Sequence, residues 1–235
     1  MKRREFMNQS AGFVVVAAAL PGNALSVAAP NKLTPPEKGK IPVAFAISEG
    51  VTVIDFAGPW EVFQDVMVPQ RGSDHEDQMP FQLFTVSEKT EVLTGSAGLK
   101  LVPDFTFDNA PQPKVVVIPA QRGSAALHAW LKKVTEKTDV TMSVCTGAFQ
   151  LGRAGLLSGK SATTHHDFFE QFAKAFPDVN LKRGLRFVEN EKISTAGGLT
   201  SGIDLALRVV ERYFGRTVAE TTATYMEYQS KGWIV

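Results

Sequence analysis

Cys145 is the residue whose type and setting most clearly suggest chemistry. The apolar, β-branched run 140–144 precedes it and predicts a buried strand. Phe149, Gln150 and Leu151 follow it and predict the first turns of a helix. Because a sharp strand-to-helix turn holds a nucleophile clear of the sheet with its side chain exposed, this pattern predicts a reactive thiol.

The predicted helix start would also influence the pKa of that thiol. The free N–H groups of Thr146, Gly147 and Ala148 would point back at the sulfur, and the partial positive charge of a helix N-terminus favours thiolate. We therefore expect a pKa below that of a free thiol, about 8.5. Thr146 would also offer its N–H as an oxyanion donor. The alternative is an inert core residue, since free cysteines are often buried.

Asp55 is the carboxylate that we expect to act with this thiol. The apolar stretch 51–55 predicts a strand that ends at Asp55, and Gly58 and Pro59 then predict the start of a helix. A carboxyl group within hydrogen-bond reach of a thiol can share its proton and act as general base to water. Glu61 could orient the same cluster. The alternative is that Asp55 only caps the helix.

Two histidines, His165 and His166, follow a predicted strand over residues 161–163. His165 is a candidate base, or else part of a hydrogen-bonded wall, with His166 or Asp167 capping the next helix. Neighbouring histidines are expected to point in different directions, and no third ligand lies at metal-binding spacing. We therefore expect no metal site.

Strands that alternate with helices must position these residues. Apolar central strands in such a series predict a doubly wound, mostly parallel α/β sheet sandwiched by helices, of flavodoxin-like type, whose ligands bind beyond the carboxyl ends of the strands. We expect strands at 41–47, 81–87, 115–118, 140–144, 161–163, 186–189 and 193–195, a hairpin over 92–102, a surface loop over 69–80, and helices at 125–134, 168–176, 202–214 and 218–228.

Composition excludes several classes of protein. The chain has 235 residues and a net charge of +1, so nothing indicates binding to nucleic acid or to an anionic membrane. Its single cysteine excludes a disulfide scaffold. The sequence contains no phosphate-binding glycine loop. We expect no cofactor, and we expect a small-molecule substrate as partner.

The first residues have the pattern of an export signal. Arg3, Arg4 and Phe6 resemble the twin-arginine motif, and an apolar run over residues 11–20 has the length of a signal-peptide core. A small-residue cleavage site near Ala28 or Ala29 follows. We expect a cleavable signal at 1–29, a mobile linker at 30–40, a single domain at 41–235 and a periplasmic location without stable membrane insertion. An uncleaved anchor and a misassigned start are the alternatives.

Four segments together resemble the DJ-1/PfpI superfamily of class I glutamine amidotransferase-like proteins. They begin at Asp55, Val144, Ala162 and Gly197 and read DFAGPWEVF, VCTGA, ATTH and GGLTSGID. The resemblance covers residues 41–228. Within the superfamily the chain is most similar to isonitrile hydratase and to the amidotransferase-like domains of AraC-type regulators.

This resemblance implies functional roles for Asp55, Cys145 and Thr146, and it implies a homodimer. The implied activity is cysteine-dependent, cofactor-free hydration of an isonitrile to an N-substituted formamide by a hydro-lyase. The alternatives are glyoxalase or deglycase chemistry on reactive carbonyls, and a non-enzymatic redox-sensing or chaperone-like protein. A regulator is not expected, because about seven residues follow the last predicted helix.

The loop after strand 115–118 departs from the pattern of the superfamily. Pro-Gly-Gly is frequent there and helps to form the oxyanion hole, whereas this chain has Pro119, Ala120, Gln121 and Arg122. A backbone donor at Ala120 or Gln121 is expected to survive. The larger side chains would reshape the pocket and so change the substrate.

We predict that the protein is exported and its first residues removed. Fractionation of cells that express a tagged protein, with N-terminal sequencing, should place it in the periplasm and find a mature chain that begins near Ala29 or Pro30. A variant in which Lys replaces both Arg3 and Arg4 is the control and should stay in the cytosol. Recovery of wild-type chain that begins at Met1 in the cytosol would contradict the prediction.

Overall fold

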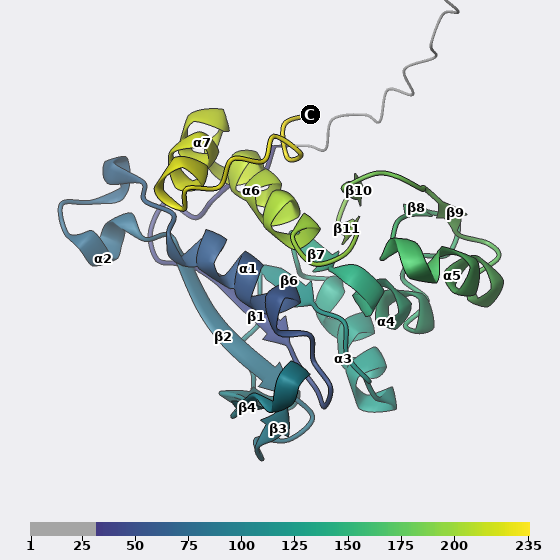
Figure 1. The fold of residues 1–235 in the computed structure, drawn as a ribbon. Coiled ribbons are helices and arrows are strands. Elements are labelled where there is room, and N and C mark those ends of the chain that lie inside the picture. The colour runs from purple at the N-terminus through teal and green to yellow at the C-terminus, as the bar shows by residue number, and fades with distance from the viewer. Residues whose placement is uncertain (1–31) are drawn as a thin grey trace, which may run out of the picture.

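A sheet of seven strands lies at the centre of the structure, a computed structural model that describes residues 32–235 (Figure 1). The strand order is β10-β11-β7-β6-β1-β2-β5. Neighbouring strands pair in parallel except β10 and β11, which are antiparallel. The strands are β1 (Ile41–Ala46), β2 (Phe81–Ser87), β5 (Phe105–Thr106), β6 (Val115–Ile118), β7 (Val140–Ser143), β10 (Phe187–Glu189) and β11 (Ile193–Ala196). The predicted fold class is confirmed.

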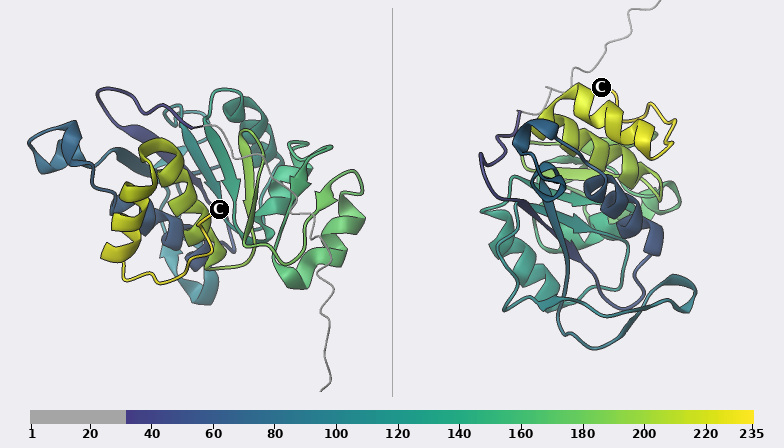
Figure 2. Two further views of the ribbon diagram at one scale, coloured as in Figure 1. Left: turned by 90° about the horizontal axis from the view of Figure 1, so that it is seen from above. Right: turned by 90° about the vertical axis from the view of Figure 1, so that its left-hand side faces the viewer.

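Helices cover both faces of this sheet (Figure 2). One face packs against α1 (Val53–Gln64), α6 (Ser201–Phe214) and α7 (Arg216–Tyr225). The other packs against α3 (Ala125–Thr135), α4 (Ala148–Arg153) and α5 (Phe169–Ala175). The structure therefore has three layers with one apolar core on each side of the sheet.

The side chains of β1 show how one strand supplies both cores. Val43 and Phe45 point into the core beneath α1 and α6, whereas Ala44 and Ala46 point into the core beneath α3 and α4. All four are fully buried. A strand buried on both faces reads as a continuous apolar run, and each large side chain buried in this way contributes about 1.5–3 kcal/mol.

Smaller elements lie around the sheet. The predicted hairpin over 92–102 is confirmed as an antiparallel pair of short strands, and the predicted strand at 161–163 pairs outside the main sheet. The loop predicted over 69–80 contains one short α-helix and one 3-10 turn. These elements are β3 (Leu93–Thr94), β4 (Lys100–Leu101), β8 (Ser161–Ala162), β9 (Asn180–Leu181), α2 (His75–Gln78), η1 (Pro69–Arg71), η2 (Ser96–Gly98), η3 (Cys145–Gly147) and η4 (His166–Phe168).

The strand predicted over 51–55 is wrong. The helix α1 begins at Val53, so Asp55 lies in its first turn and Pro59 lies inside it. The apolar residues that suggested a strand do not all lie in the core, since Val53 is half-buried and Ile54 is exposed. Pro59 has no N–H to donate to the carbonyl of Asp55 four residues earlier, and the helix continues past this one lost bond.

The predicted signal peptide, residues 1–29, lies outside the described residues, as does the start of the predicted linker. The rest of the linker is fastened to the fold, since Leu33 N–H donates to the Arg212 carbonyl at 2.8 Å and Arg71 donates to the Pro36 carbonyl at 2.9 Å. Within residues 32–235, no helix has the length and apolar character needed to cross a bilayer.

Gly147 brings the turn after β7 close to the end of β6. A Cβ atom at this position would lie 2.1 Å from the carbonyl oxygen of Ile118 and 2.9 Å from that of Pro119. Real atoms do not approach so closely, and both neighbours are backbone, so they cannot rotate away. A glycine is therefore required here for the two chain segments to touch.

We predict that Gly147→Ala destabilises the protein by about 2–3 kcal/mol, because the backbone must shift to admit the methyl group. Thermal or urea unfolding measures this. The matched control is Gly58→Ala in α1, where the added carbon would meet side-chain atoms rather than backbone, the nearest being Ile203 Cγ1 at 2.8 Å. There the gain in helix propensity, about 0.5–1 kcal/mol, offsets the strain. Equal stability losses in the two variants would contradict the prediction.

Candidate active site

Cys145 lies at the turn between β7 and α4, as the sequence predicts, and its backbone is strained there. Its φ is 58°, in the left-handed region that non-glycine residues rarely adopt. Three bonds hold it in this conformation: Cys145 N–H donates to the Gly197 carbonyl at 2.7 Å, Thr164 Oγ1 donates to the Cys145 carbonyl at 2.9 Å, and Val144 N–H donates to the Ile118 carbonyl at 2.9 Å. The strained turn fixes the position of the thiol.

Asp55 is the acidic partner of this thiol and is fully buried. Its Oδ2 accepts the backbone N–H of Ala120 at 3.1 Å, and Thr52 N–H donates to the Ala120 carbonyl at 2.9 Å. The residue is therefore not the cap of α1, a position that Thr52 occupies. Among the described residues its Oδ1 has no hydrogen bond of good geometry. Asp55 thus ties the start of α1 to the loop after β6 and keeps one oxygen for the thiol.

Burial raises the pKa of Asp55 to about 6, although the N–H groups of Ala120 and Leu199 and the thiol of Cys145 act in the opposite direction. A carboxyl group with this pKa is ionised at neutral pH and can still accept a proton readily. These are the properties required of a general base.

The prediction of an acidic thiol is wrong. Burial, together with the negative charge of Asp55, raises the pKa of Cys145 to about 12, although the N–H groups of Thr146 and Leu199 act in the opposite direction. The sulfur lies in a residue that is 7% exposed, so the partial charge of a short helix does not compensate for lost solvation. The resting pair is therefore a neutral thiol beside an ionised carboxylate.

Leu199 completes this pair through its backbone, and the sequence analysis missed it. Its φ is 51°, a second left-handed non-glycine residue at the site. Its N–H lowers the pKa of both Asp55 and Cys145. The next residue, Thr200, is held by Arg186 Nη2 at 3.2 Å and by Tyr228 Oη at 3.3 Å. The sequence analysis could not have found this role, because leucine as a residue type does not indicate a left-handed backbone conformation.

Of the other predicted site residues, two line a small pocket and one is exposed on α1. Thr146 and Gln121 line a pocket of about 200 Å³ that also contains Phe149 and Gln150. The side chain of Gln121 turns inward, since its Nε2 donates to the Ala46 carbonyl at 2.7 Å. Of the two predicted backbone donors, the Ala120 N–H is occupied by Asp55, so a donor at the Gln121 N–H stays a prediction. Glu61 is exposed on α1, and in the described residues no interaction joins its side chain to Asp55. The prediction that Glu61 orients the cluster is not supported.

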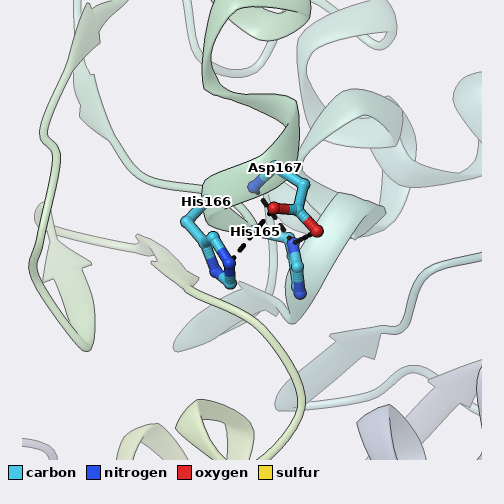
Figure 3. A group of neighbouring side chains, drawn as sticks. All are labelled: His165, His166 and Asp167. Atoms are coloured by element: carbon cyan, nitrogen blue, oxygen red, sulfur yellow. Dashed lines mark hydrogen bonds and ion pairs between the residues drawn. The ribbon is translucent and has the colours of Figure 1, made fainter.

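His165 and His166 stack on each other, so the expectation that they point in different directions is wrong (Figure 3). Their ring centroids are 4.4 Å apart, and His166 Nε2 lies 3.1 Å from Asp167 Oδ1. His165 caps η4 by accepting the Asp167 N–H at 3.3 Å, and its ring packs on Gly198. Donor atoms of these three residues lie within 4.8 Å of one another and could hold a metal ion. A metal at His165 Nδ1 would displace this cap.

The arrangement can carry out nucleophilic addition followed by hydrolysis. A buried carboxylate can remove the thiol proton as the sulfur attacks, and later remove a proton from water. Backbone N–H groups of Thr146 and Leu199 stabilise negative charge at the sulfur. Free thiolate is not required, because the base lies beside the nucleophile.

Comparison with known proteins gives a family match and several relatives. The model of the DJ-1/PfpI family matches residues 42–212. An isonitrile hydratase from Pseudomonas putida is 30% identical over 195 residues, which are 79% of this chain and 78% of that protein. The transcriptional regulator GbdR of Pseudomonas aeruginosa is 27% identical over 154 residues, 63% of this chain and 42% of the regulator. The chain thus matches less than half of the regulator.

Solved structures show the same fold. A ThiJ/PfpI family protein from Pseudomonas syringae is 25% identical with a TM-score of 0.71, over 92% of this chain and 84% of that one. DJ-1beta of Drosophila melanogaster is 15% identical with a TM-score of 0.67, over 82% of this chain and all of that one.

We predict that Cys145 reacts slowly with iodoacetamide at pH 8, roughly a hundredfold more slowly than a free thiol, because little thiolate forms. Asp55→Asn should react about tenfold faster, since the charge that raises the thiol pKa is gone. Mass spectrometry over time measures both rates. Glu61→Gln on the same helix is the control and should match wild type. An Asp55→Asn rate at or below that of wild type would show that the carboxylate does not control the thiol.

Proposed function

Because the chain belongs to the DJ-1/PfpI family, we propose that it is a cysteine-dependent enzyme that hydrates a small substrate without a cofactor, specifically an isonitrile to an N-substituted formamide. The observation that supports this most directly is the buried pair of Asp55 and Cys145, with Thr146 next in the chain. The 30% identical isonitrile hydratase supports the choice of substrate class.

In the first step the Cys145 sulfur attacks the terminal carbon of R–N≡C. Asp55 takes the thiol proton as the S–C bond forms and then delivers it to that carbon, which becomes the C–H of a thioimidate, R–N=CH–S–Cys145. The pKa of Asp55, about 6, suits both transfers. No step needs a stable thiolate, in keeping with the raised pKa of the thiol.

In the second step water adds to the thioimidate carbon. Asp55 removes a proton from the water and passes it to nitrogen. The C–S bond then breaks, the second water proton returns to sulfur, and R–NH–CHO leaves with the free enzyme restored. The N–H groups of Thr146 and Leu199 stabilise the charge on the departing sulfur.

The other activities considered have less support. Redox-sensing cysteines are exposed and have low pKa values, whereas Cys145 is 7% exposed and its pKa is raised. A glyoxalase would use the same pair on a carbonyl carbon, and the substrate panel below includes methylglyoxal for that reason. We also propose a periplasmic location, from the signal pattern at residues 1–29, and a homodimer, from the family resemblance.

We predict that Cys145→Ala and Asp55→Asn each lower kcat for isonitrile hydration by 100-fold or more, about the contribution of a general base. The double variant should be little worse than either single variant, because both residues act in one sequence of steps. For wild type, kcat/KM should rise with pH through about 6 and then level off, since Asp55 must lose its proton to act as base. Formamide production, measured by chromatography, reports all of these values.

Glu61→Gln is the matched control and should keep wild-type turnover, and thermal melts should show that every variant folds. Methylglyoxal, assayed alongside, should not be consumed. Near-wild-type hydration by a folded Asp55→Asn protein would remove Asp55 from the mechanism and make His165 the next candidate base. Consumption of methylglyoxal without hydration of isonitriles would favour the glyoxalase instead.

A further inference from the structure

Two arginines line the pocket that contains Thr146. We infer that this pocket binds a carboxylate on the substrate through Arg122 and Arg153. The inference deepens the proposed function, on which it rests, by naming the substrate as a small molecule with a reactive group at one end and an anionic group at the other.

The position of the pocket connects it with the reacting pair. Thr146 follows Cys145 directly, and Gln121 follows Ala120, whose N–H holds Asp55. Two lining residues of the pocket are therefore direct chain neighbours of Cys145 and of Ala120, the residue that binds Asp55. A ligand in this pocket contacts Thr146, the residue next to Cys145, near the carboxyl ends of β6 and β7, where ligands bind in such sheets.

No carboxylate lines this pocket, and neither arginine forms an ion pair within residues 32–235. The acidic neighbours of the lining residues Phe168 and Gln171 have other partners. Asp167 lies against the two histidines, and Glu170 pairs with Arg183 at 2.8 Å. Arg122 and Arg153 supply the charge of this pocket, since its other lining residues are uncharged. Arginine matches the geometry of a carboxylate with two parallel hydrogen bonds, so a carboxylate is the complementary ligand.

Both arginines are presented by restrained segments. Gln150 is buried, its Nε2 donates to the Gln121 carbonyl at 3.1 Å, and its Oε1 lies 2.8 Å from His128 Nε2. Gly123, at a φ of 71°, lets the loop that carries Arg122 pass against Gln150. Arg153 ends α4 with its guanidinium 5.8 Å from the centre of the Phe149 ring. Both arginines are exposed, and these segments place them in the lining of one small pocket.

A second pocket provides an internal comparison. Arg122 also borders a hollow of about 550 Å³, but Glu49, Glu88 and Glu91 line that hollow together with Lys89. Its three carboxylates would repel an anion. The smaller pocket has no acidic wall, so an anionic ligand is directed toward Thr146. At about 200 Å³ it fits a group of only a few atoms.

The test compares iodoacetate with iodoacetamide as alkylating agents. They differ only in carboxylate against amide, and Cys145 is the only cysteine, so one mass shift reports each rate. The measured quantity is the rate ratio of iodoacetate to iodoacetamide, divided by the same ratio for free cysteine. Ionised Asp55 alone would push this relative ratio below one. We expect a value of about five or more for wild type.

Arg122→Gln and Arg153→Gln should each lower the relative ratio at least threefold, and the double variant should bring it to one or below. Iodoacetamide rates should stay unchanged, which shows that the variants fold. Arg183→Gln is the matched control, since Arg183 is exposed and lies outside the pocket. A wild-type relative ratio of one or below, or a ratio unaffected by the two pocket variants, would overturn the inference.

A second arm separates this inference from the proposed function by comparing hydration of isocyanoacetate with that of its neutral ethyl ester. If the inference holds, Arg122→Gln lowers kcat/KM for isocyanoacetate at least tenfold and leaves the ester unchanged. Equal use of both compounds, independent of the arginines, would overturn the inference and leave the hydratase proposal intact. Arginine-dependent alkylation without hydration of either compound would reject the hydratase and support the anion site.

Discussion

The site depends on one buried carboxylate beside one buried thiol. Taking Asp55 out of water raises its pKa, and the resulting charge next to Cys145 keeps the thiol protonated. Three separate segments meet to hold this pair: the first turn of α1, the loop after β6 through Ala120, and the loop before α6 through Leu199. The parallel sheet brings them to one edge. Nucleophile and base therefore share a single proton whose position the protein environment decides.

Burial, rather than the helix end, controls the thiol. A helix N-terminus contributes on the order of 1 kcal/mol near the surface, whereas removing a charged sulfur from water costs several times more. Cys145 is followed by a 3-10 turn and a helix of six residues, so its local dipole is small. In the proposed mechanism, such a thiol reacts only when a substrate and Asp55 act on it together. Such a thiol is also protected from adventitious oxidation.

Much of the fold could be predicted from periodicity, because strands such as β6 are continuous apolar runs and α6 has a clear apolar face. Cys145 could be placed at its turn from the flanking strand and helix patterns alone. The helix start at Val53 could not be predicted, since a short run of β-branched residues such as Val53 and Ile54 is equally typical of a strand. Leu199 and Ala120 could not be found either, because they act through backbone atoms whose direction depends on conformation rather than on residue type.

This reliance on the main chain has an evolutionary consequence. Ala120, Thr146 and Leu199 offer N–H groups that every residue except proline possesses, so mutation can replace their side chains while the donors remain. Side chains that line the adjoining pocket, such as those of Arg122 and Arg153, do not hold Asp55 or Cys145 in place. The fold thereby separates a reaction centre held by main-chain donors from a pocket wall formed by side chains. New substrates can be acquired by changing the wall, without rebuilding the chemistry.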